Sequence, residues 1–196
     1  FNKTMHPYEL PAGKLGAGMG CTYATAGMKL ELGKWYTNWS VCKDYCDKNG
    51  IPLVMVWSNA TCIHCWYCDV CFIQDSFKEW AATHNAGKVI YCFMAGGDKN
   101  GAPDQIGSAA YNWMYYGGGR KLTAYPFTVL WWKKNGVNVR KTGDELCNSK
   151  SFTDASIPTR TANIIAEMEA AFAGWAPVEY AGGKMELDET EGNRLE

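Results

Sequence analysis

Residues 51–57 form a short apolar run without a single polar position, and this run constrains the fold more than any other feature of the chain. A strand that is apolar at every position has to be covered on both faces. A second run of this kind follows at residues 89–94. Two such strands, with a helix between them, predict a parallel crossover in a sheet that carries helices on both faces.

Helical patterns occupy the segments between the strands. Trp35, Trp39, Cys42 and Cys46 fall at i, i+4, i+7 and i+11 and predict an amphipathic helix that ends at residues 49–50. Further helices are expected at residues 62–84, at residues 104–116 and around residues 164–172.

The second half of the chain predicts an antiparallel pair. Residues 127–132 and 137–141 are two strand-like runs separated by Asn135-Gly136, a strong hairpin signal. The expected fold is therefore α/β, with a mixed central sheet of about four strands and helices on both faces. Residues 1–33 are expected to be an irregular N-terminal extension, residues 34–176 the domain, and residues 177–196 a polar acidic tail.

Composition limits the function classes. The chain has 196 residues, of which 47% are hydrophobic and 20% charged, and this balance is typical of a globular protein. A net charge of −1 indicates neither nucleic acid nor an anionic membrane as a partner, and no apolar run is long enough for membrane insertion. The chain begins at Phe1 without a signal-peptide pattern, so it is expected to be an excised piece, and its localisation stays unknown.

Cys62-Ile63-His64-Cys65 lies where the first apolar strand gives way to a helix. The unpaired N–H groups and partial positive charge of a helix N-terminus favour a thiolate over a thiol. A lowered pKa would make Cys62 a nucleophile at neutral pH, and Cys65, one turn later, could resolve the mixed disulfide. His64 could place an imidazolium beside the thiolate, which would make the disulfide a stronger oxidant.

Together with a later proline that opens a strand, this motif resembles the thioredoxin-like superfamily. The second half of the resemblance is Tyr125-Pro126 followed by residues 127–136. The resemblance implies that Pro126 is a cis-proline facing the motif and that Tyr125 offers backbone groups to a bound substrate chain, with Ile63 also touching the substrate. In the preceding strand, where many relatives carry a buried acid, this chain has Met55, so the usual proton acceptor for Cys65 is missing there.

The resemblance implies a thiol–disulfide oxidoreductase that exchanges a Cys62–Cys65 disulfide with protein thiols and disulfides. It implies no cofactor and no metal, because the redox pair belongs to the protein itself. The direction of electron flow stays open, since His64 favours oxidation or isomerisation whereas an odd number of cysteines favours a reducing compartment.

Two alternatives compete with this function. The domain could be a redox-inactive module of a larger polypeptide or assembly, with a purely structural disulfide. Alternatively, the run Cys62, Cys65, Cys68 and Cys71 could bind a metal or an iron–sulfur cluster. Three-residue steps along a continuous helix turn successive sulfurs away from one another, so convergence on one ion would require a loop.

The remaining cysteines carry weaker signals. For Cys68 and Cys71, reduced side chains are favoured over a mutual disulfide, because residues three apart on a helix are about 5–6 Å apart at Cβ. Cys42 and Cys46 lie on the apolar stripe of their helix and Cys92 lies in an apolar strand, so all three are expected to be buried. Cys21 and Cys147 are expected in loops.

Overall fold

The computed structural model describes residues 21–59, 63–83, 89–96, 113, 126–148 and 153–172. In chain order the strands are β1 (Thr22–Tyr23), β2 (Trp35–Thr37), β3 (Leu53–Asn59), β4 (Ile90–Gly96), β5 (Phe127–Trp132) and β6 (Val137–Thr142). The α-helices are α1 (Trp39–Asn49), α2 (Ile63–Phe72), α3 (Asp75–Thr83), α5 (Gly143–Cys147) and α6 (Ile157–Ala171). Short 3-10 turns, η4 (Lys133–Asn135) and η5 (Asp154–Ser156), complete the described elements.

The strands form one mixed sheet in the order β1-β2-β4-β3-β5-β6. The first four of these are parallel neighbours, whereas β5 is antiparallel to both β3 and β6. The mixed α/β class is confirmed, but the expectation of about four strands is wrong, because the described part of the chain already contributes six to the sheet.

The two additional strands lie at one edge of the sheet, before α1. Trp35 was expected on the helix, but it belongs to β2, whose three residues are aromatic or β-branched and so suit a strand. Asn38 then adopts a left-handed conformation with φ 80°, which separates β2 from the helix. Residues 21–33, expected to be part of an irregular extension, include β1.

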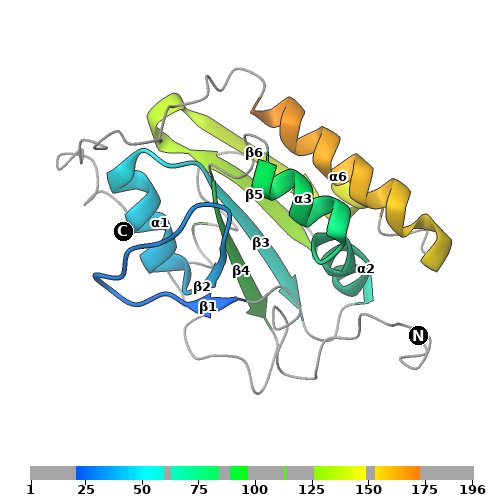
Figure 1. Ribbon diagram of the computed structural model, residues 1–196, viewed down its shortest axis with the longest axis horizontal. Coiled ribbons are helices and arrows are strands. Elements are labelled where there is room, and N and C mark those ends of the chain that lie inside the picture. Colours follow the sequence, from blue (N-terminus) through cyan, green and yellow to red (C-terminus); the bar gives the residue numbers. More distant parts are fainter. Residues whose placement is uncertain are drawn as a thin grey trace.

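Helices cover both faces of the sheet, as expected. In Figure 1, α1 lies on one side, and α2, α3 and α6 lie together on the other. The core on the α1 side contains Met55 of β3 and Cys92 of β4. The core on the opposite side contains Val54 and Val56 of β3, because side chains alternate along a strand.

The α1 helix ends where the sequence predicts. Gly50 has φ 63°, a conformation that costs a glycine little, and its N–H bonds the Cys46 carbonyl. Cys42 and Cys46 are fully buried against the sheet, which confirms the prediction for both.

The helix expected at residues 62–84 is two helices. A turn at Ile73 and Gln74 separates α2 from α3, and the Gln74 side chain donates to the Val70 carbonyl at 2.8 Å. Asp75 opens α3, where a carboxylate is favourable. The break lets Phe77 and Trp80 pack against the same core as α2.

The β5–β6 hairpin is confirmed. Trp132 pairs with Val137, and Gly136 closes the connection with φ 67°. The helix predicted at residues 104–116 lies outside the described residues except for Trp113.

Candidate active site

The Cys-X-His-Cys motif follows the central strand β3 in the chain, and its last three residues open the helix α2. β3 is buried along its apolar run, and α2 begins at Ile63, one residue after Cys62. Cys62 itself lies outside the described residues. Cys65 is fully buried, and His64 is half-buried with its ring edge-on to Tyr67 at a centroid distance of 6.0 Å.

The beginning of α2 suits a thiolate. Its first turn carries no acidic residue, so no carboxylate offsets the partial positive charge of the helix N-terminus. Because α2 begins at Ile63, the predicted start of a helix at the motif is confirmed. The thiolate form of Cys62 stays a prediction.

Pro126 lies at the same end of the sheet as the motif. It is buried and directly precedes β5, whose first residue, Phe127, pairs with Trp57 near the end of β3. The Pro126 carbonyl accepts a hydrogen bond from Gly143 N–H at 2.9 Å. Tyr125 lies outside the described residues, as does the side chain of Ile63.

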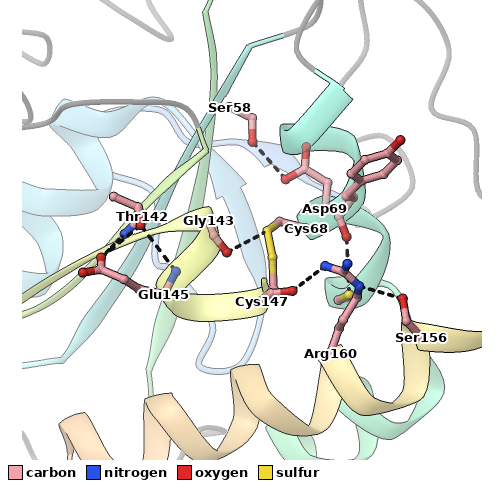
Figure 2. The surroundings of a disulfide bond; sticks show 11 residues. Ser58, Cys68, Asp69, Thr142, Gly143, Glu145, Cys147, Ser156 and Arg160 are labelled. Atoms are coloured by element: carbon pink, nitrogen blue, oxygen red, sulfur yellow. Dashed lines mark hydrogen bonds between the residues drawn. A yellow bond between two sulfur atoms is a disulfide. The ribbon is translucent and has the colours of Figure 1, made fainter. Parts of the chain in front are cut away.

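A buried carboxylate lies one helical turn beyond Cys65. Asp69 is 1% exposed and accepts a hydrogen bond from the Ser58 hydroxyl of β3 at 2.9 Å (Figure 2). Residues four apart share one face of a helix, so Cys65 and Asp69 lie on the same side of α2.

Asp69 is a residue that the sequence analysis missed. In β3, where an acid is expected by resemblance, Met55 faces the core on the α1 side, away from α2. The spacing of four between Cys65 and Asp69 was the available signal.

A disulfide joins Cys68 of α2 to Cys147 at the end of α5, with 6.1 Å between the Cα atoms (Figure 2). The expectation of a reduced Cys68 is therefore wrong, and Cys147 lies in a helix and not in a loop. The Cβ separation that disfavours a bond between Cys68 and Cys71 concerns two residues on one helix. It sets no limit on a partner 79 residues away.

Arg160 of α6 fixes the end of α5 beside this disulfide. Its guanidinium donates to the Cys147 carbonyl and, at 2.7 Å, to the Ser156 hydroxyl (Figure 2). The Thr142 and Glu145 side chains form a capping box at the other end of α5. Both ends of this short helix are thus anchored around the bond.

Cys71 is a buried thiol on the same helix. Its Sγ lies 3.5 Å from the Tyr67 carbonyl. Burial raises the pKa of Cys71 to about 11, although a side-chain hydrogen bond with Thr161 and the nearby Arg160 act in the opposite direction. At neutral pH Cys71 is a poor nucleophile.

Of the four-cysteine run, the structure describes Cys65, Cys68 and Cys71. Cys68 is bonded to Cys147, and among the described residues no group of three or more His, Cys, Asp or Glu side chains is arranged to hold a metal ion. None of the helices in the described ranges has the length and apolar character needed to cross a membrane.

Comparisons with family models, with curated proteins and with solved structures find no match to this chain.

Proposed function

We propose that this chain is a thiol–disulfide oxidoreductase with a thioredoxin-like fold, in which Cys62 and Cys65 form the redox pair. The observation that carries the proposal is the buried Cys65 in the first turn of a helix that follows the central strand β3. The parallel β3–β4 pair and the antiparallel β5–β6 pair support the fold assignment.

In the reducing direction, the Cys62 thiolate attacks a disulfide of a protein substrate. One sulfur of the substrate leaves as a thiolate, and the other forms a mixed disulfide with Cys62. Cys65 then loses its proton and attacks the Cys62 sulfur, which releases the second substrate thiolate and leaves a Cys62–Cys65 disulfide. The same steps in reverse oxidise a substrate dithiol.

The burial of Cys65 supports the division of roles between the two cysteines. A buried sulfur is protected from external disulfides and reacts with a neighbour in its own chain. Asp69 is the nearest acid along this helix face, and we assign it the role of proton acceptor when Cys65 becomes a nucleophile.

The experiment that tests the proposal is the trapping of a mixed disulfide. We expect Cys65→Ser to accumulate a covalent complex through Cys62 with a disulfide-containing model protein, because the resolving sulfur is gone. Non-reducing electrophoresis followed by peptide mapping identifies the bond. Cys62→Ser is expected to trap nothing, and Cys71→Ser, which removes a buried thiol of the same helix, is expected to behave as the wild type.

Absence of any complex with Cys65→Ser would contradict the proposal. It would leave a redox-inactive module of a larger protein, especially if the Cys62–Cys65 pair also had a very low reduction potential against a glutathione series.

Substitution of Asp69 tests the assigned proton acceptor. We expect Asp69→Asn to slow the resolving step by roughly 100-fold at neutral pH, since general-base assistance contributes about that much. The rate of the variant should keep rising with pH, because hydroxide replaces the missing base. Stopped-flow measurement of substrate release gives this profile.

The matched control is Asp75→Asn, which removes an exposed carboxylate from the neighbouring helix α3. This variant should keep the wild-type rate. An Asp69→Asn variant with a wild-type rate and pH profile would show that the carboxylate has only a structural role beside Ser58.

A further inference from the structure

Gly143, the first residue of α5, contacts both the helix of the motif and the start of β5. Its N–H donates to the Pro126 carbonyl at 2.9 Å. Its own carbonyl oxygen lies 3.8 Å from Cys68 Sγ of α2 (Figure 2). Gly143, Cys68 and Pro126 are all buried. One buried residue therefore connects the helix that carries Cys65 with the proline that precedes β5.

The Cys68–Cys147 disulfide makes the connection between α5 and α2 covalent. Gly143 is the first residue of α5 and Cys147 is the last, so both ends of this five-residue helix contact Cys68. On its other side, the Cys147 carbonyl accepts a hydrogen bond from the Arg160 guanidinium of α6. The position of α5 relative to α2 is thus fixed by a bond, and not by packing alone.

The hydrogen bond from Gly143 matters to Pro126 because proline has no N–H. The carbonyl is the one backbone group through which Pro126 can hydrogen-bond, and Gly143 donates to it. The next residue, Phe127, pairs with Trp57 of β3 and with Thr142 of β6. Pro126 is therefore held by the sheet through Phe127 and by α5 through Gly143.

We propose that Gly143, Cys68 and Cys147 are positioning residues of the redox site, which set the separation between Pro126 and the first turn of α2. The proposal rests on the proposed function, because the thioredoxin-like fold implies that Pro126 borders the groove for the substrate chain. A substrate disulfide held in that groove reaches the Cys62 sulfur only at the correct separation. A displacement of about 1 Å can lower a rate by roughly 100-fold.

Gly143→Pro tests the proposal, since it removes the N–H that bonds Pro126 and leaves both cysteines in place. Proline is favoured at the first position of a helix. Thr142, with φ −73° and ψ 166°, already has the extended backbone that the residue before a proline adopts. We therefore expect the variant to fold with the Cys68–Cys147 bond intact, which mass spectrometry of the unreduced protein checks.

The second-order rate constant for reaction of reduced Gly143→Pro with a disulfide-containing model peptide should fall roughly tenfold or more, because the groove is displaced. The reduction potential of the Cys62–Cys65 pair against glutathione should stay at its wild-type value. The pKa of the Cys62 thiol, measured from the pH dependence of alkylation by iodoacetamide, should also be unchanged. Both quantities are set by α2, and a general loss of structure would alter them together with the rate.

The matched control is Val139→Ala, which removes an apolar side chain of β6 from the core and leaves the contacts of Gly143 in place. This variant should be less stable than the wild type and should react with the peptide at the wild-type rate. Cys68→Ala combined with Cys147→Ala tests the disulfide. Under conditions in which circular dichroism shows a folded chain, this double variant should lose rate as Gly143→Pro does.

A folded Gly143→Pro variant with the wild-type rate constant would overturn the proposal, while exchange by the wild type would still support the redox function. An equal loss of rate in Val139→Ala would also overturn it, because lowered stability would then explain both results. A folded double cysteine variant with the wild-type rate would remove the disulfide from the positioning role. If either test variant does not fold, the other decides. If the wild type does not react with the peptide, the redox function is wrong, and the positioning role is overturned with it.

Discussion

Replacing Cys68 and Cys147 together with alanine is expected to lower the free energy of unfolding by about 4 kcal/mol. The bond joins residues 79 positions apart. In the chain-entropy description, a loop of this length restricts the unfolded chain enough to account for a value of about 4 kcal/mol. Urea denaturation of the oxidised wild type and of the double variant measures the difference.

Three further samples show whether the bond itself is responsible. Cys68→Ala alone and Cys147→Ala alone should each cost about as much as the double variant, because one substitution already removes the cross-link. The wild type in a thiol reductant keeps both sulfurs and should lose a similar amount. If reduction leaves the urea midpoint unchanged while the alanine variants are destabilised, the loss comes from packing and not from the cross-link.

The parts of the fold that follow from local patterns were predictable from the sequence. The apolar runs that became β3 and β4 and the Asn135-Gly136 hairpin are signals within a few consecutive residues. Trp35 shows where a local pattern misleads. Its spacing to Trp39 and Cys42 matches a helix, but the left-handed backbone of Asn38 separates the strand that contains Trp35 from the helix. The break between α2 and α3 is similar, since the apolar pattern continues across Gln74 and only the local hydrogen bonds reveal the turn.

The candidate site was predictable where its residues are adjacent in sequence. The motif from Cys62 to Cys65 and the onset of α2 follow from a strand and a helix pattern that meet. The Cys68–Cys147 pairing does not, because no local rule selects one partner among distant cysteines. Asp69 is an intermediate case, since its position relative to Cys65 is local but its burial depends on Ser58 of a different element.

A buried ion pair on α1 was also beyond sequence reasoning. Lys43 and Asp47 are one helical turn apart and would ordinarily be read as an exposed pair, but the side chains are 1% and 0% exposed. Their charged groups are 2.9 Å apart, and Trp131 Nε1 donates to the second oxygen of Asp47 at 2.7 Å. The Lys43 ammonium lies 4.5 Å and 4.9 Å from the ring centroids of Trp131 and Trp113.

Trp113 also contacts a second cation, Arg140. The Arg140 guanidinium lies 4.9 Å from the Trp113 ring centroid and donates to the Trp113 carbonyl at 3.2 Å.

Burial lowers the pKa of Lys43, and Asp47 opposes this effect. The Lys43 ammonium is therefore held in the core by the Asp47 carboxylate and by the rings of Trp113 and Trp131. Asp47 in turn accepts the hydrogen bond of Trp131.

Lys43→Met is expected to lower the free energy of unfolding by about 3 to 5 kcal/mol, because it leaves the Asp47 carboxylate buried without a cation. The double variant Lys43→Met with Asp47→Leu should recover most of this loss, since apolar side chains of similar volume can replace a buried pair at little cost. Urea denaturation followed by tryptophan fluorescence reports both stability and the environment of Trp113 and Trp131.

The same helix supplies the matched control. Lys48 and Asp44 have the same spacing and a separation of 3.1 Å, but their side chains are 40% and 46% exposed. Lys48→Met should therefore cost roughly 0.5 kcal/mol or less, because water screens the pair. Equal effects of Lys43→Met and Lys48→Met would contradict the buried pair. A double variant no more stable than Lys43→Met alone would show that Asp47 is needed for its hydrogen bond to Trp131 and not only as the counter-charge of Lys43.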